Sequence, residues 1–236
     1  MKLRSVCALV LATLAAPAMA GSDFDDLGLL SQSEFVKLSK DFVSAGSYKA
    51  VSPAEPLGIV GFDIGIEATA TKLDNSSVWA KAGFDDSTLY LPKVHVHKGL
   101  PFNVDLGASL VMVPGSDIKL IGAEVKYAIL PGGVASPALS VRAAATRLFG
   151  VDQLDLDTRS LELTVSKGFL NFTPYAGVGK VWGTVTPHAG NLRKESPTGN
   201  KIFAGVNVSL GIVNLAGEVD TTGGNKSVSV KLGFRL

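Results

Sequence analysis

The sequence contains a single cysteine, Cys7, and that cysteine lies within the first 20 residues. Residues 1–20 have the features of a signal peptide: a basic start at Lys2 and Arg4, an apolar run, and small residues before a cleavage point at Ala20. We expect this peptide to be removed during export, which leaves a mature chain without cysteine. Disulfide bonds, thiol nucleophiles and cysteine metal ligands are therefore excluded from the mature protein.

The chain also lacks long apolar runs and an excess of charge of one sign. After residue 20, no stretch is long and apolar enough for a transmembrane helix, so a membrane could be crossed only by strands. The chain has 22 Lys and Arg residues; removing Lys2 and Arg4 leaves 20 against 21 acidic residues, a net charge of −1. Such a chain offers no electrostatic basis for binding nucleic acid, and we expect no nucleic-acid partner.

A two-residue alternation is the main pattern that the sequence does contain, and it is clearest from Gly58 to Lys72. Successive side chains of a strand point to opposite faces, so this stretch has one wholly apolar face and one face of small or polar residues with two carboxylates. The stretch is longer than the usual strand of about five or six residues and matches a strand tilted across a bilayer. The apolar face consists of Val60, Phe62, Ile64, Ile66, Ala68 and Ala70.

The alternation recurs about ten times through residues 57–236, and in nine of these strands the apolar parity carries no charge within the expected membrane depth. The strands are joined by short connections on one side. On the other side two connections are long, Leu73 to Ser87 and Val185 to Gly199, and two are short, Val113 to Asp117 and Thr222 to Asn225. This asymmetry is typical of short periplasmic turns and longer external loops. We therefore predict an all-β fold: a transmembrane antiparallel up-and-down β-barrel of about ten strands, with a short N-terminal amphipathic helix.

Residues 21–56 differ from the barrel and form a separate N-terminal segment. Ser31 followed by Glu34 is a capping-box pattern, and it predicts a helix from Gln32 to Ala45. This helix could plug the barrel, lie on the membrane surface, or cover one barrel end. Packing on the periplasmic rim is favoured, because surface helices are amphipathic by default. If the helix is a plug, its apolar contacts are Phe35, Leu38 and Phe42.

The polar parity of the strands carries isolated charges, which we expect to face the lumen. A ten-stranded lumen is narrow, so we expect these charges to form ion pairs that fill it. In particular, Lys231 is placed to reach Asp63 on one neighbouring strand and Glu218 on the other. The expected network consists of Asp63, Glu67, Lys93, Asp105, Glu124, Lys126, Arg142, Glu162, Glu218, Asp220, Lys231 and Arg235.

His95 and His97 share the lumen-facing parity of one strand. Such a pair could bind a metal or act as a base. No third ligand of clear spacing is visible, and we interpret both histidines as packed lumen residues. The sequence thus predicts no metal site, no cofactor and no catalytic residue.

Residues 1–20 together with Gly58 to Leu236 resemble a bacterial outer-membrane β-barrel protein. The last strand, Ser227 to Leu236, resembles the C-terminal assembly signal of that superfamily, with alternating apolar residues and an aromatic residue near the end. It departs from the pattern at Leu236, where the superfamily most often has Phe, although Phe234 keeps the same facing. The resemblance implies the outer membrane of a Gram-negative bacterium, contact with membrane lipid and lipopolysaccharide, and recognition by the barrel assembly machinery through the C-terminal strand.

These patterns favour a small passive pore or a structural barrel whose lumen is largely filled, and not an enzyme. Three alternatives remain open: a channel for hydrophobic small molecules that the N-terminal helix plugs, a lipid-modifying barrel enzyme, and an adhesin that acts through the long loops. The sequence does not indicate an oligomeric state.

Overall fold

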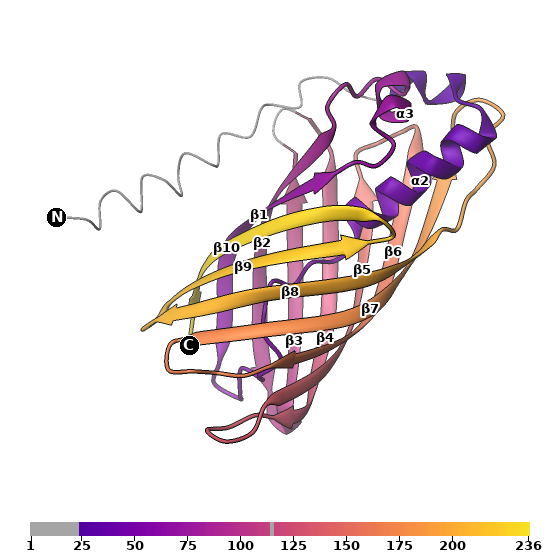
Figure 1. Cartoon of the computed structure of the whole chain (residues 1–236). Helices are drawn as coiled ribbons and strands as arrows, with labels where there is room; N and C mark the ends of the chain where they lie inside the picture. Colours follow the sequence, from indigo (N-terminus) through magenta and orange to yellow (C-terminus); the bar gives the residue numbers. More distant parts are fainter. Residues whose placement is uncertain (1–23, 114–115) are drawn as a thin grey trace.

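The computed structural model describes residues 24–113 and 116–236, so the expected signal peptide lies outside the described residues. Within them, ten antiparallel strands close into a barrel in which each strand pairs with its sequence neighbours and the first pairs with the last (Figure 1). This confirms the predicted up-and-down barrel. The strands are β1 (Phe62–Lys72), β2 (Thr88–Leu100), β3 (Val104–Met112), β4 (Lys119–Pro131), β5 (Ala138–Phe149), β6 (Leu154–Ser166), β7 (Phe172–Pro187), β8 (Thr198–Leu210), β9 (Val213–Thr222) and β10 (Asn225–Arg235).

The alternation along each strand separates an apolar outer surface from a polar lumen. On β1, Ile64 and Ile66 are exposed on the outside, whereas Asp63 and Glu67 are buried inside. On β7, Tyr175 and Val181 are buried in the lumen, and Trp182 is exposed on the outer surface. An apolar outer wall around a polar lumen is the arrangement typical of a membrane-spanning barrel.

The two ends of the barrel differ. We call the end with the C-terminal Leu236 and the short connections the turn end, and the opposite end, with the β1–β2 connection, the loop end (Figure 1). Phe102, Tyr127 and Phe234 are exposed near the turn end, as in the aromatic girdle of a membrane barrel. Among the described residues, no helix is both long and apolar enough to cross a membrane.

The predicted N-terminal helix is present as α2 (Gln32–Gly46). The Ser31 hydroxyl accepts a hydrogen bond from the Glu34 backbone N–H, and the Glu34 carboxylate accepts one from the Ser31 backbone N–H, so the capping box is complete. Further short helices are η1 (Asp25–Leu29), α3 (Ser76–Lys81) and η2 (Pro101–Asn103). The sequence analysis expected the α3 region to be a plain loop; instead, it folds over α2.

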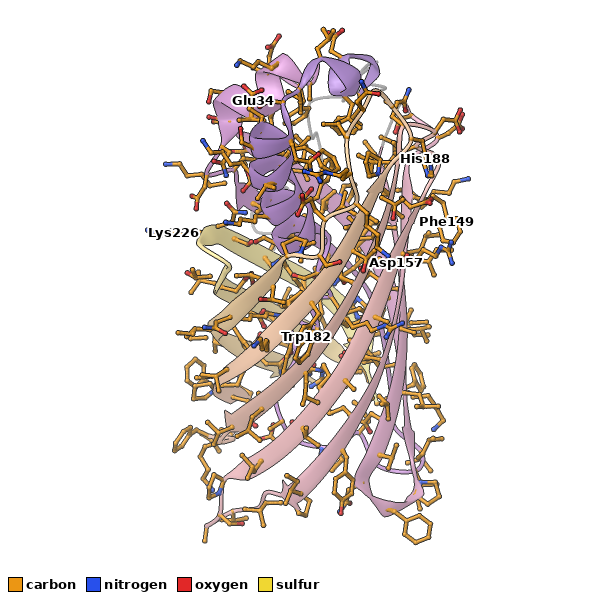
Figure 2. All side chains as sticks on the ribbon, turned by 90° about the vertical axis from the view of Figure 1, so that its right-hand side faces the viewer. Glu34, Phe149, Asp157, Trp182, His188 and Lys226 are labelled. Carbon is orange, nitrogen blue, oxygen red and sulfur yellow. The ribbon has the colours of Figure 1, made fainter. Side chains whose placement is uncertain are left out.

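The favoured position of α2 was wrong. The helix does not pack at the end that carries the short turns; it lies at the loop end, where it contacts β6, β7, β8, β10 and α3 (Figures 1 and 2). Its apolar face is covered by the inner faces of the strands and by α3, so it does not lie on the membrane surface either. An amphipathic pattern specifies only that one face is buried, and it does not specify which end of the barrel buries it.

After α2 the chain descends through the lumen in an extended conformation to reach β1 at the turn end. Tyr48 lies near the loop-end half, where its carbonyl accepts a hydrogen bond from Lys201 of β8. Leu57 lies near the turn end, where its N–H donates to Asp105 of β3. We call residues 47–57 the lumen segment.

Candidate functional site: the filled lumen

Asp63 is the centre of one cluster of lumen charges, at the turn-end half. Its Oδ2 lies 3.0 Å from Lys231 Nζ and 2.6 Å from Arg235 Nη2, and its Oδ1 lies 3.3 Å from His95 Nε2. The Asp63–Lys231 contact is the one that the sequence analysis expected across the seam between β1 and β10. Since two cations share one buried carboxylate, removal of Asp63 would leave both without their partner.

The second expected partner of Lys231 was wrong. Glu218 accepts a hydrogen bond from the Tyr175 hydroxyl at 3.0 Å and forms no ion pair with Lys231 in the described structure. The strand register gives the reason, because Lys231 lies opposite Ala216 of β9, whereas Glu218 lies opposite Ser229. Neighbouring strands of a barrel are staggered, so residues at equal distances from their strand ends need not lie side by side.

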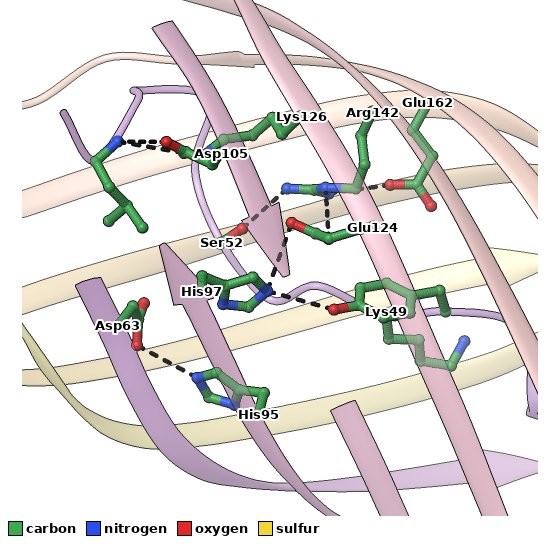
Figure 3. A network of polar contacts seen from close by, with 12 residues as sticks. Lys49, Ser52, Asp63, His95, His97, Asp105, Glu124, Lys126, Arg142 and Glu162 are labelled. Atoms are coloured by element: carbon green, nitrogen blue, oxygen red, sulfur yellow. Dashed lines mark hydrogen bonds and ion pairs between the residues drawn. The ribbon is translucent and has the colours of Figure 1, made fainter. Parts of the chain in front are cut away.

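Arg142 is the centre of a second cluster (Figure 3). Its Nε lies 3.0 Å from Glu124 Oε2 and its Nη1 lies 3.1 Å from Glu162 Oε2. Lys201 Nζ approaches the other oxygen of Glu162 at 2.7 Å. Arg142 Nη2 donates a further hydrogen bond to the Ser52 hydroxyl of the lumen segment, at 2.9 Å. The cluster therefore joins four barrel strands, β4, β5, β6 and β8, to the lumen segment.

The structure places all twelve residues of the expected network on the lumen face, where ten are buried and Lys93 and Arg235 are half-buried. Further pairs are Lys126–Asp105 at 2.9 Å, Lys93–Glu67 at 2.7 Å and Lys49–Asp220 at 3.0 Å.

Sequence reasoning missed two of the cations, Lys49 and Lys201. Lys201 lies on the same face of β8 as Gly205 and Asn207. Extending the alternating pattern toward the start of this strand would therefore have placed Lys201 in the lumen. Lys49 had no such signal, since it belongs to the irregular lumen segment.

His95 and His97 face the lumen and are buried, with their ring centroids 5.1 Å apart. His97 Nε2 lies 3.4 Å from Glu124 Oε1 and 3.3 Å from the Tyr48 hydroxyl. The third potential ligand that the spacing did not reveal is Asp63, which lies directly opposite His97 in the β1–β2 register. The three side chains offer ligand atoms within 4.8 Å of one another. However, Lys231 and Arg235 already bind Asp63, so a divalent cation there would adjoin two positive charges.

Barrel side chains satisfy the backbone of the lumen segment along its length. Lys126 Nζ donates to the carbonyls of Pro53 and Glu55, and Lys93 donates to the carbonyl of Lys49. Ser166 accepts a hydrogen bond from the N–H of Ala54 at 2.9 Å. An extended segment without strand partners would otherwise bury unsatisfied backbone groups, which is costly. The lumen side chains therefore hold this segment specifically.

An apolar cluster closes the loop-end half of the lumen. Phe35, Leu38 and Phe42, the expected plug contacts, are all buried, and the structure places them against Trp79 of α3 and the inner faces of β6 and β7. The ring centroids of Phe42 and Trp79 are 4.5 Å apart. Trp79 Nε1 donates to Asp41 Oδ2 at 3.0 Å, so the buried indole has a partner.

The start of α2 is tied to α3 on the outer side of this cluster. Lys81 Nζ lies 2.5 Å from Glu34 Oε1. Its hydrogen bond, together with those from Ser31, lowers the pKa of the Glu34 carboxyl to about 2.

Little open space remains inside the barrel. In the described chain, the cavities that lie against the lumen segment have volumes of about 20 and 10 Å³. A third, of about 60 Å³, lies within the apolar cluster. Since about 10–15 Å³ of such space holds one water molecule, these cavities hold at most a few waters each and none of them is a channel through the barrel.

No family model and no curated protein matches this chain. Solved structures do match. OmpTdeltaL8, a loop deletion mutant of the outer membrane protein OmpT of Vibrio cholerae, is 12% identical over 64% of this chain, which spans 55% of that protein, with a TM-score of 0.34. The KdgM porin is 8% identical, over 73% of this chain and 98% of that one, with a TM-score of 0.37.

A third match is the translocator domain of the autotransporter NalP from Neisseria meningitidis. It is 12% identical, over 94% of this chain and 100% of that one, with a TM-score of 0.38. Likeness at this level carries no argument about this chain. The fold rests on the strand pairing and facing described above, which show a closed antiparallel up-and-down β-barrel with an apolar outer wall and a polar lumen.

Proposed function

We propose that this protein is an integral outer-membrane barrel that its own N-terminal segment keeps closed: a structural barrel with a filled lumen and not an open pore. The observation that carries this proposal is the anchoring of the lumen segment. Its backbone is bound by Lys93, Lys126, Ser166 and Lys201 of four different strands. Thus a specific network, and not loose packing, keeps the segment in the barrel.

The outer surface supports a membrane location. Exposed apolar side chains cover the wall of the barrel, and exposed aromatic side chains lie toward both of its ends, including Phe102 and Phe234 at the turn end and Tyr90 and Trp182 toward the loop end. Export through a cleaved signal peptide and insertion by the barrel assembly machinery through β10 belong to the same proposal. Contact of the outer wall with membrane lipid and lipopolysaccharide is also part of this proposal.

Conductance in a planar lipid bilayer tests the closed lumen. The intact protein should show no steady current, because the lumen segment blocks the only route through the strands that the structure describes. Replacing Lys49 with Met removes the ion pair with Asp220 and should produce intermittent channel openings. Large, steady, porin-like conductance of the unmodified protein would contradict the proposal.

Cysteine labelling tests the orientation. The mature chain is expected to contain no cysteine, so a single one can be introduced at Lys37 on the exposed face of α2, or at Val134 in the β4–β5 turn. A membrane-impermeant maleimide added to intact cells should label Lys37→Cys and leave Val134→Cys unlabelled. Labelling in the reverse pattern would place α2 in the periplasm.

One observation favours a second candidate, a channel for hydrophobic small molecules. The cavity of about 60 Å³ is lined by Phe24, Phe42, Trp79 and other apolar side chains at the loop end. Entry of a hydrophobic molecule there would require α2 to move. Quenching of Trp79 fluorescence by an added hydrophobic probe, with loss of the effect in Phe42→Ala, would support this candidate over the passive barrel.

We further propose that the protein is not an enzyme. The histidines that resemble a catalytic pair are enclosed by Asp63, Glu124 and Tyr48 and face no open cavity large enough for a lipid. Replacing both His95 and His97 with Gln should leave the composition of the outer-membrane lipids unchanged. Loss of a lipid modification in that double variant would establish the enzyme alternative.

A further inference from the structure

The outer surface of the barrel carries a large hollow over β5 to β10. Its volume is about 950 Å³, far larger than the three inner cavities described above. The side chains that line it are mostly apolar and point outward, among them Val178, Ile202 and Val228. Small residues form its floor: Ala176, Gly177 and Ala204. A molecule that fills this hollow must be apolar along most of its length.

The hollow follows two rows of outward residues that cross the strands. One row begins at Lys226 of β10 and passes through Thr221 and Ile202 to Val178 and Leu163. The other ends at Leu139, near the turn end of β5. Six adjacent strands at the usual spacing span roughly 24 Å, measured across the strands. Because Lys226 lies near the loop end and Leu139 near the turn end, the hollow runs obliquely down the barrel from Lys226.

A pair of lysines stands at the upper end of the hollow. Lys226 lies directly opposite Lys72 of β1 in the strand register, and both are exposed on the outer surface (Figure 2 shows Lys226 pointing away from the barrel). Like charges in directly opposite positions destabilise a sheet. In the described chain no carboxylate forms an ion pair with either lysine, whereas Lys93 and Lys231 in the lumen each have one. An anion between the two side chains would remove this repulsion.

We propose that the hollow binds a phosphorylated, acylated lipid of the outer leaflet, of the lipid A type. Lys72 and Lys226 bind its phosphate, and an acyl chain lies over Ala176 and Ala204. This inference rests on the proposed membrane location and adds a specific lipid site to it. The two observations that support it, an unpaired lysine pair and an apolar hollow that begins at one of those lysines, are independent of each other.

Native mass spectrometry of the detergent-purified protein tests the site with three probes: diphosphorylated lipid A, the same lipid with both phosphates removed, and inorganic phosphate. We expect one diphosphorylated lipid A to be retained per chain. Replacing Lys72 and Lys226 with Ser should weaken its binding about fivefold per lysine, because each lysine near a charged lipid surface contributes roughly that factor. Lys119→Ser, at an outward lysine of β4 at the same barrel end, is the matched control and should have no effect.

Filling the hollow tests the apolar part. The double variant Ala176→Leu, Ala204→Leu should reduce the retention of lipid A, whereas Ala123→Leu, at an exposed outward alanine of β4, should not. The site is overturned if the controls lose lipid equally, if the dephosphorylated lipid is retained as well as lipid A, if phosphate alone binds, or if the protein is found as a dimer that the Leu variants dissociate.

A failure of this inference can be told from a failure of the proposed function. Each variant is first compared on gels with and without heating, where a closed barrel migrates differently from the unfolded chain. Variants that insert and migrate as closed barrels but show no difference in lipid retention contradict the lipid site alone. Recovery of the unmodified protein in the soluble fraction contradicts the membrane location itself.

Discussion

The two halves of the lumen are filled in different ways. The turn-end half is filled by ion pairs around Asp63 and Arg142, with the lumen segment threaded among them. The loop-end half is filled by the apolar face of α2 against Trp79 and the inner faces of the strands. Charges need partners in a narrow lumen, whereas apolar side chains need only to be covered. The charged half therefore fixes the position of the lumen segment, and the apolar half seals the end where α2 lies.

The comparison predicts that the charged half is the more sensitive to loss of one partner. Arg142→Met leaves Glu124 and Glu162 without their shared cation and should lower the free energy of unfolding by roughly 3–5 kcal/mol, less any part that lumen water recovers. Arg147→Met is the control on the same strand. The Arg147 side chain is 61% exposed on the outer surface and lies 3.7 Å from Asp157, so this substitution should lower the free energy of unfolding by at most about 1 kcal/mol. If the two variants unfold at the same urea concentration, the lumen is filled with water and its charges do not depend on one another.

The apolar half should respond to loss of volume. Leu38 is fully buried under α2, so Leu38→Ala should destabilise the protein by about 2–5 kcal/mol and loosen the helix from the barrel. Leu29→Ala, at a residue that is 78% exposed, should have little effect. Protease digestion of the folded protein measures the outcome: the cleavage between α2 and β1 should accelerate in Leu38→Ala only. A protected α2 in that variant would mean that the ion pairs alone hold the segment.

A double-mutant cycle sharpens the account of the seam. Lys231→Met and Asp63→Asn should each lower the unfolding midpoint, and together they should cost less than their sum, with a coupling of about 0.5–3 kcal/mol. The pair Lys231→Met and Glu218→Gln should be additive within about 0.5 kcal/mol, because Glu218 is bound to Tyr175 instead. Coupling in the second pair, and none in the first, would reverse the assignment of partners.

The smallest effect is expected where α2 begins. The folded-state pKa of Glu34, about 2, lies below its ordinary value of 4.5, so its hydrogen bonds to Lys81 and Ser31 stabilise the folded state fully above pH 4.5 and are lost as the pH falls toward 2. Glu34→Gln should abolish this part of the acid sensitivity. The measurement is the difference between the unfolding midpoints of the two proteins at pH 7 and at pH 3; no difference at either pH would mean that the contact contributes nothing.

The strand pattern was readable because it is local. The facing of Ile64, Asp63 and Glu67 follows from the pleat of a single strand, and the capping box at Ser31 needs only the three residues that follow it. The lumen position of the charges was predictable for the same reason. Two lumen charges were exceptions. Lys201 was missed because the alternating pattern of β8 was taken to begin at Ile202, and Lys49 was missed because it belongs to no strand.

The sequence by itself determined the barrel, its outward and inward faces, the existence of the helix and twelve of the lumen charges, but not Lys49 or Lys201. Only the tertiary structure decided that α2 lies at the loop end, that Glu218 binds Tyr175 and not Lys231, that Asp63 joins the two histidines, and that an outer hollow begins at Lys226. These features depend on the stagger between strands and on how side chains from many strands pack in a closed space. A local pattern specifies faces, whereas partners across the lumen are set by contacts between residues far apart in the chain.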